Sequence, residues 1–196
     1  GPKTYNHYPN GWAMAFNTPF KMWKRYEFNG GTSDPCIISW PAGMSSKGEI
    51  RTQYHHAIDL VPTVLDALGI DAPEKIKGHT QSHFDGVSMR YSFDDASAPG
   101  TRQTQFYSML GSRGIWHDGW KAVAWHKPRT SFDEDHWELY HVESDWSESR
   151  DLAAWQARHR DRVRVVFTES PQDSMAINEI RSGAVPVAAR GMCDAG

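Results

Sequence analysis

The chain has 196 residues, of which 39% are hydrophobic and 12% aromatic, so it can bury a sizeable core. Its 21 basic and 24 acidic residues leave a formal net charge of −3, which argues against a general nucleic-acid-binding protein. The sequence contains no apolar run of about 18 residues, so we expect no membrane-spanning helix.

The first 20 residues predict an irregular segment, because prolines and a glycine recur among polar and aromatic residues. A segment of this length without secondary structure needs a scaffold to lie on, which suggests that part of the protein precedes it. The opening also lacks an initiator Met and the apolar stretch of a signal peptide, so we expect an internal start.

A short apolar run, PCIISWP at residues 35–41, predicts a buried strand bounded by prolines. Because apolar residues occupy consecutive positions, we expect both faces of its sheet to be covered and Cys36 to be a buried thiol. The rest of the chain offers few such strands as partners, which again points to a part of the protein outside this chain.

The clearest predicted helix covers residues 59–70, DLVPTVLDALGI. One face carries apolar side chains at the 3.6-residue period and is expected to pack: Ile58, Val61, Leu65 and Leu68. Pro62 lies in the first turn, where a missing N–H is tolerated, and Gly69 supplies the C-terminal stop. The adjacent His55 and His56 fit the start of this helix better than they fit a functional pair.

Residues 71–104 are rich in Asp, Ser, Gly and Pro and are expected to be mostly loop. Residues 105–142 predict an antiparallel meander, because three stretches have strand character and HDG at residues 117–119 is a hairpin turn signal. We expect a short helix from about Glu148. The tail at residues 171–196 is small and polar without periodicity, so it is left unassigned.

Several familiar catalytic patterns are absent from the sequence, including the GxSxG elbow, the Walker loop and HExxH. The acidic run at residues 133–135 is expected to be a solvated loop rather than a cation site. The stretch KMWKRYEFNGG at residues 21–31 is a weak signal by itself, because lysines beside aromatic residues often pack their stems and expose their ammonium groups.

The order of several segments resembles the C-terminal part of the sulfatases, the arylsulfatase-like members of the alkaline phosphatase superfamily. That family pattern has a lysine with a Gly-Gly six residues later, a proline-bounded strand ending in WP, a D-x-x-PT-x-LD helix, a hairpin with a Trp-Lys pair, an LYD-like strand and a turn into NLA. The matching segments here are Lys24, Gly30-Gly31, PCIISWP, Asp59 to Asp66, Gly119 to Lys121, Leu139-Tyr140 and Asp151 to Ala153. The stretch GWAMAFNTPFKMWKRYEFNGG is similar to large bacterial, notably mycobacterial and proteobacterial, arylsulfatases.

The resemblance implies an α/β fold, namely the C-terminal part of the alkaline-phosphatase-like sulfatase fold. We expect edge elements of its large sheet, one packed helix and a small antiparallel β-sheet subdomain. On this reading residues 1–104 are the incomplete end of the catalytic domain, residues 105–170 are the small subdomain and residues 171–196 are the tail. Residues 154–196 depart from the usual ending of the family.

The resemblance also implies a catalytic and substrate-binding role for Lys24, because the matching family lysine reaches the sulfate near the leaving-group oxygen. A fixed ammonium group there would stabilise the negative charge that develops as the S–O bond breaks. The two glycines would let the backbone turn tightly and return Lys24 to the site. Lys21 and Arg25 do not match the family lysine and are expected to be surface cations. Further substrate-binding candidates come from the irregular opening: His7, Trp12, Asn17 and Thr18.

The catalytic groups of the family are not evident in this sequence. The family nucleophile is a formylglycine made within a C/S-x-P/A-x-R motif, and neither Cys36 nor Cys193 begins one. The divalent cation, usually calcium, is held by paired Asp residues and an Asp-Asn pair that we do not find here. The chain therefore resembles the C-terminal fragment of an arylsulfatase-like sulfuric ester hydrolase, and by itself it is expected to be inactive.

The expected partners are a sulfate ester substrate, an aryl sulfate by resemblance, and the missing N-terminal half of the catalytic domain. We expect no nucleic acid and no membrane as partners. Two alternatives stay open: a phosphate or phosphonate monoester hydrolase of the same superfamily, and a glycan-binding module that uses some of the nine Trp residues. The sequence does not decide between the bacterial cytoplasm and the periplasm.

Overall fold

The computed structural model describes residues 2–154, 163–169 and 175–182. The chain divides into two compact units, one made of residues 1–35 and 104–196 and the other of residues 36–103. Both units mix short helices with antiparallel strand pairs or sheets, so the expected combination of helices with a small antiparallel sheet is confirmed.

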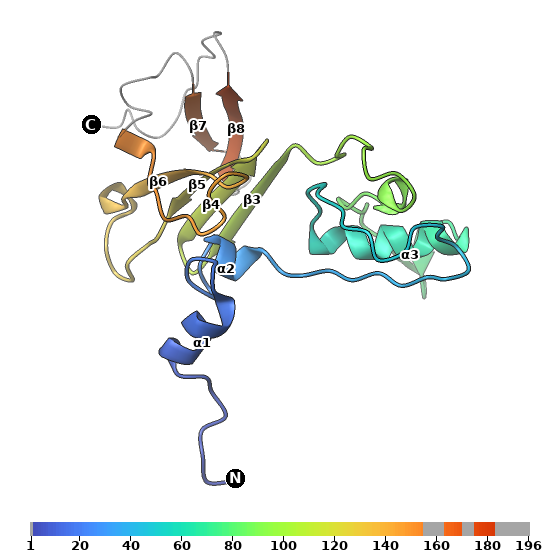
Figure 1. Cartoon of the computed structure of the whole chain (residues 1–196), viewed down its shortest axis with the longest axis horizontal. Coiled ribbons are helices and arrows are strands. Elements are labelled where there is room, and N and C mark those ends of the chain that lie inside the picture. The colour runs from blue at the N-terminus through green and yellow to red at the C-terminus, as the bar shows by residue number, and fades with distance from the viewer. Residues whose placement is uncertain (1, 155–162, 170–174, 183–196) are drawn as a thin grey trace. The chain divides into compact units, whose positions relative to one another are not determined.

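The first unit is built on a four-stranded antiparallel sheet in the order β3-β4-β5-β6 (Figure 1). Its strands are β3 (Thr104–Met109), β4 (Ser112–His117), β5 (Trp120–Ala124) and β6 (Trp137–His141). Two tight turns join the first three strands, and each places both central residues at positive φ: Leu110-Gly111 and Asp118-Gly119. Such turns match the twist of a hairpin, so the predicted meander and its HDG turn are confirmed.

The two faces of this sheet bury different sets of side chains, as the two-residue period of a strand requires. Ile115, Ala122 and Leu139 form the core on one face. Val123 and Tyr140 lie on the opposite face, where they pack against Phe28 from the N-terminal part of the chain. The second face therefore carries the segment around residues 21–32.

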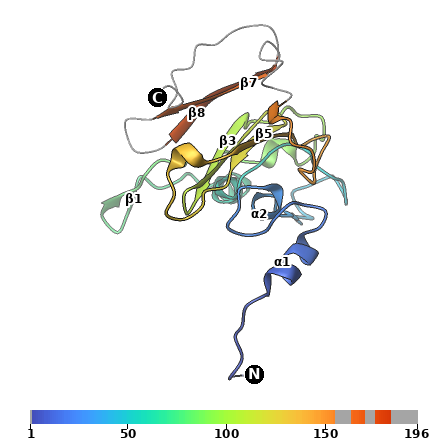
Figure 2. The same ribbon diagram turned by 90° about the vertical axis from the view of Figure 1, so that its left-hand side faces the viewer.

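The part of the first unit before the sheet contains the helices α1 (Asn10–Asn17) and α2 (Asn29–Thr32). Figure 1 and Figure 2 both place α2 beside the four-stranded sheet. The prediction of an irregular opening is wrong for α1. Pro9 has a φ compatible with a helix and lies just before its first residue, and Thr18, whose conformation is extended because it precedes Pro19, comes only after its last residue. No residue of α1 is buried.

The second unit contains a helix and several short elements. These are η1 (Ala57–Asp59), α3 (Leu60–Leu68), β1 (Lys75–Ile76), β2 (His79–Thr80) and η2 (Arg90–Ser92). The predicted helix is confirmed, and Gly69 ends it in the left-handed conformation at φ 64°. His56 caps the helical segment, because its side chain accepts a hydrogen bond from the backbone N–H of Ile58. The prediction of a helix start at the two histidines is therefore confirmed.

Two expectations of burial in the second unit are wrong. The apolar face of α3 is largely exposed, with Val61 at 52% and Leu68 at 64% exposure, and Thr63 is the buried residue of the helix. The run at residues 35–41 forms no strand, Ile37 is 93% exposed and the Cys36 thiol is exposed as well. The physical reason is that no strand among the described residues pairs with this run.

The C-terminal part of the chain differs from the prediction at two places. Glu148 lies in a turn with its side chain buried, and the helical conformation that was expected from about this residue first appears at residues 153–154. The rest of that predicted helix lies outside the described residues. Within the tail that the sequence left unassigned, Met175–Ser182 forms strand β8, which pairs antiparallel with β7 (Val163–Glu169). None of the described helices has the length and apolar character needed to cross a membrane.

Candidate functional site

The lysine loop, defined here as residues 18–28, is closed at its base by hydrogen bonds between α1 and α2. The Asn17 side-chain amide donates to the carbonyl oxygens of Met22 at 3.1 Å and of Gly30 at 2.6 Å. The backbone N–H of Gly30 donates to the Lys21 carbonyl at 2.9 Å. These bonds hold the two ends of the loop together and leave Lys24 at its outer part.

The double glycine allows this closure because two backbone segments approach each other closely. A Cβ atom on Gly30 would lie 2.1 Å from the Met22 carbonyl oxygen, and one on Gly31 would lie 1.9 Å from the Tyr26 carbonyl oxygen. Both distances are far below van der Waals contact, so any larger residue would displace the loop. Both glycines lie in the short helix α2, so the requirement is space for the backbone rather than a positive φ.

Lys21 fixes the loop to the sheet, so the expectation that it is a surface cation is wrong. Its ammonium nitrogen lies 2.7 Å from Oε2 of Glu138 and 2.8 Å from the hydroxyl oxygen of Tyr140. The same nitrogen lies 4.3 Å from the centre of the Phe28 ring, within range of a cation–π interaction. Lys21 is therefore occupied by partners within the protein, whereas Arg25 is exposed.

Lys24 lines a pocket of about 530 Å³ and is exposed. Its side chain makes no hydrogen bond or ion pair with any residue in the described part of the chain. The other lining residues include three aromatic side chains and one carboxylate: Tyr8, Ala13, Phe16, Asn17, Trp23, Gly30, Gly31 and Asp34. A cation with no polar partner among the described residues thus meets aromatic surface in one concave site, which suits an anion attached to an apolar or ring-shaped group.

Of the other residues predicted for the site, only Asn17 joins Lys24 in the pocket lining. His7 contacts the ring of Tyr5, with ring centres 4.8 Å apart. Trp12 stacks on Phe16 at 5.7 Å and reaches the pocket only through that ring. The hydroxyl of Thr18 donates to the Ala15 carbonyl at 2.8 Å, which ends α1.

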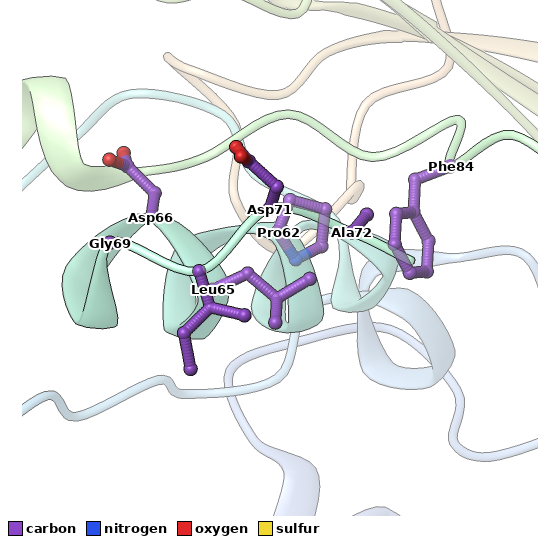
Figure 3. Close-up of a pocket in the computed structure, with 8 residues that line it drawn as sticks. Pro62, Leu65, Asp66, Gly69, Asp71, Ala72 and Phe84 are labelled. Carbon is purple, nitrogen blue, oxygen red and sulfur yellow. The ribbon is translucent and has the colours of Figure 1, made fainter. Parts of the chain in front are cut away.

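A second pocket lies in the other unit, between α3 and the segment that follows it (Figure 3). It has a volume of about 410 Å³ and carries the carboxylates of Asp66 and Asp71 among mainly apolar side chains. Among the described residues, no lysine, arginine or histidine lines it, although Asp66 pairs with Arg90 at 3.1 Å. A lining with two carboxylates and no cation does not favour an anionic ester, so this pocket does not suit a sulfate.

Sequence reasoning missed a group of buried polar side chains beneath the lysine loop. Lys121 of β5 is 2% exposed, and Glu148 is 1% exposed. Burial lowers the pKa of Lys121 to about 8, although Glu148 and Glu27 oppose this change, so the side chain is still mainly an ammonium at neutral pH. The signal that was available is a lysine inside the otherwise apolar strand WKAVA.

Glu27, within the lysine loop, is buried against the same face of the sheet. A Cβ atom on Gly114 of β4 would lie 2.7 Å from the Cβ atom of Glu27, so this glycine leaves room for the carboxyl group. Burial raises the pKa of Glu27 to about 7, while its own N–H, the N–H of Met109 and the charge of Lys121 oppose the change. The carboxyl group therefore changes its charge near neutral pH.

The acidic run at residues 133–135 is only partly the solvated loop that was expected. The side chain of Asp135 is 2% exposed, one of its carboxylate oxygens lies 2.5 Å from Arg113, and the other lies 3.0 Å from Nδ1 of His126. This ion pair joins β4 to the residues before β6.

The matched motif at Asp59 to Asp66 has a structural explanation in the second unit. Asp59 is 2% exposed and accepts hydrogen bonds from the N–H of His56 at 2.8 Å and of Val87 at 2.9 Å, and it pairs with Arg102. Burial by itself would raise the pKa of Asp59, but these three donors more than offset burial and hold the pKa below its usual value. Asp59 thus joins the start of α3 to distant loops.

In the part of the chain that the structure describes, no group of three or more His, Cys, Asp or Glu side chains is arranged to hold a metal ion. The described residues therefore do not fit a calcium site. The pocket at Lys24 offers a cation and aromatic rings, and a metal bound there would need ligands that these residues do not supply.

Comparison with known proteins identifies the family of the chain. Residues 20–165 match the family described as N-sulphoglucosamine sulphohydrolase, C-terminal. An uncharacterized sulfatase of Schizosaccharomyces pombe is 26% identical over 148 residues, which cover 72% of this chain and 25% of that protein. A solved structure reported for the metabolism of multiple glycosaminoglycans by Bacteroides thetaiotaomicron has a TM-score of 0.49 at 19% identity, covering 71% of this chain and 29% of that one. The chain thus spans about a quarter of the length of this curated relative.

Proposed function

The chain belongs to the family of sulfatase C-terminal domains described as N-sulphoglucosamine sulphohydrolase, C-terminal, and from this membership we propose that it forms part of a sulfuric ester hydrolase that cleaves sulfate monoesters. In this proposal the chain does not carry out the reaction alone. It contributes one wall of the substrate site and one cation to a larger catalytic domain.

The observation that carries the proposal is the environment of Lys24. This residue lines a pocket, and its side chain has no hydrogen-bond or ion-pair partner among the described residues. A sulfate monoester is an anion, and negative charge builds on the departing oxygen when the S–O bond breaks. An ammonium group held beside that oxygen stabilises the transition state more than the bound substrate. Lys24 would supply this charge and would also attract the sulfate group.

The aromatic lining of the pocket favours an aryl sulfate or another ring-bearing ester as the substrate. Tyr8, Phe16 and Trp23 line the same pocket as Lys24. Aromatic side chains present flat apolar surface to a ring, whereas the cation is placed to meet the anionic end of the ester. The pocket volume of about 530 Å³ lies within the range of small-molecule sites.

The nucleophile and the divalent cation belong, in this proposal, to a part of the protein outside this chain. The nucleophile would be a formylglycine and the cation calcium. Two observations support this. The chain covers only a quarter of the sulfatase of Schizosaccharomyces pombe, and its second unit leaves apolar side chains exposed, such as Ile37, Val64 and Leu68. Exposed apolar surface of this kind is typical of a segment that another part of a protein covers.

Replacing Lys24 by Ala in the full-length protein tests the proposal. We expect turnover of a chromogenic aryl sulfate to fall by about 10²–10³-fold, the scale for losing one preorganised charge-stabilising group. Arg25→Ala is the matched control, because Arg25 is an exposed neighbouring cation outside the pocket lining, and it should retain wild-type turnover. Unchanged kinetics in Lys24→Ala, or faster turnover of the corresponding aryl phosphate by the unmodified protein, would overturn the proposal.

A further inference from the structure

Lys121 of β5 contacts α2, the short helix that follows the lysine loop, and attaches it to the sheet. Its ammonium nitrogen donates to Oδ1 of Asn29 at 3.0 Å and to the hydroxyl oxygen of Thr32 at 2.8 Å. The same nitrogen lies 3.4 Å from Oε1 of Glu148, while Oε2 of Glu148 accepts a hydrogen bond from the N–H of Asn29 at 2.6 Å. Lys121 and Glu148 therefore hold both the side chain and the backbone of Asn29.

The position of α2 determines the position of Lys24, because hydrogen bonds at the base of the lysine loop connect the two. Gly30, the residue after Asn29, is bonded to the Lys21 carbonyl and to the side chain of Asn17. Lys24 itself makes no polar contact with the described residues, so its place is set by the two ends of the loop. A shift of α2 on the sheet would move the ammonium group of Lys24 without breaking any contact of Lys24.

Stability alone does not account for a buried pair of charges at this place. Both Lys121 and Glu148 are almost fully removed from water, and each loses hydration that an apolar side chain would not lose. A lysine and a carboxylate of fixed geometry do, however, specify a single position for the backbone that they hold. The arrangement is therefore suited to fixing α2 at one position on the sheet.

Resting on the function proposed for Lys24, we infer that Lys121 and Glu148 are positioning residues, which set the place of the Lys24 ammonium group by fixing Asn29 and Thr32 of α2 on the sheet. They do not touch the substrate. Their contribution to the reaction passes through Lys24 and should disappear when Lys24 is removed.

A double-mutant cycle in the full-length protein, with a chromogenic aryl sulfate as the probe, tests this dependence. We expect Lys121→Met to lower kcat by on the order of 10²-fold, as a displacement of about 1 Å at a reacting group does. In a Lys24→Ala background the same change should cause little further loss. Thr32→Val removes the two hydrogen bonds of the Thr32 hydroxyl, from Lys121 at 2.8 Å and to the Phe28 carbonyl at 3.2 Å, but leaves Lys121 in place. It should show a smaller loss with the same dependence on Lys24.

Arg113→Met is the matched control, because Arg113 also belongs to a buried ion pair of the same sheet but its partner is Asp135. Any loss it causes through weaker folding should be equal with and without Lys24. Losses for Lys121→Met and Thr32→Val that are likewise equal in both backgrounds would overturn the inference. If Lys121→Met does not fold, Thr32→Val decides in the same way. A wild-type rate for Lys24→Ala would instead overturn the proposed function, so the two failures are distinguishable.

Discussion

The backbone of Gly30 passes so close to that of Met22 that a Cβ atom on Gly30 would lie 2.1 Å from the Met22 carbonyl oxygen. This contact closes the lysine loop together with the hydrogen bond from Gly30 to Lys21. It explains why a glycine stands at this position, since the carbonyl oxygen belongs to the backbone and cannot rotate away as a side chain would.

We expect Gly30→Ala to displace the lysine loop and to lower both stability and turnover of aryl sulfate. Overpacking of this kind costs about 1–3 kcal/mol of unfolding free energy. Gly11→Ala is the control, because a Cβ atom at Gly11 would meet no described atom within 4 Å apart from its chain neighbours and the backbone of its own helix, and alanine favours helix α1. Denaturant unfolding and steady-state kinetics of both variants provide the measurement. Equal behaviour of the two variants would contradict the close-approach explanation.

Asp59→Asn should strongly destabilise the second unit. The change removes the negative charge of Asp59, whose side chain is 2% exposed and pairs with Arg102, and changing one partner of a buried ion pair costs about 3–5 kcal/mol. Asp66→Asn is the control, because the pair of Asp66 with Arg90 is exposed and worth about 0–1 kcal/mol. Urea unfolding followed by Trp fluorescence and circular dichroism compares the two. A loss for Asp59→Asn no larger than that for Asp66→Asn would refute the structural role of this motif.

Glu27 should make stability depend on pH between its unfolded and folded pKa values. Because burial raises the pKa of Glu27 from 4.5 to about 7, the folded state holds a proton over this range that the unfolded state has lost. The contribution of Glu27 is therefore fully present below about pH 4.5 and is lost as pH rises to about 7. Its slope is at most about 1.4 kcal/mol per pH unit.

The variant Glu27→Gln isolates this contribution, because other titrating groups cancel in the difference between variant and wild type. We expect the stability of Glu27→Gln relative to wild type to be greater at pH 7.5 than at pH 5, as measured by urea unfolding at both values. A difference that does not change with pH would show that Glu27 titrates normally.

Phe16 should affect substrate binding more than the chemical step. Its ring lines the pocket of Lys24 and is 70% exposed, so its removal leaves the core intact. An aromatic contact is worth about 0.5–1.5 kcal/mol, so Phe16→Ala should raise KM for an aryl sulfate about 2–10-fold while kcat stays near wild type. Tyr5→Ala removes a ring that is 88% exposed and outside the pocket, and serves as the control. A fall in kcat with unchanged KM would speak against ring binding at Phe16.

Features that depend on neighbours in the sequence were predicted well. The two hairpin residues Asp118 and Gly119 and the helix stop at Gly69 carry their own conformational preferences, and the structure has them as expected. The family membership rests on a similar kind of information, because the order of short motifs is a property of the chain alone. The helix α1 was missed because prolines and polar residues around it outweighed a short helical stretch.

Burial and partnership were decided only by the tertiary structure. The resemblance to the sulfatases singled out Lys24, and its role stays a prediction. The sequence also predicted that Lys21 is a surface cation, whereas the structure pairs Lys21 with Glu138. The run at residues 35–41 was predicted to be buried and is exposed. An apolar composition indicates that a segment tends to pack against other apolar groups, but it does not indicate where those groups lie.

By itself, then, the sequence determined the family, the local turns and the lysine that carries the proposed function. Which cations are free to meet a ligand was decided by contacts across long stretches of chain, such as the one that joins Lys121 to Asn29, 92 residues away. The physical reason is that local conformation follows from short-range sterics and hydrogen bonds, whereas the availability of a charged group depends on which distant groups have already satisfied it.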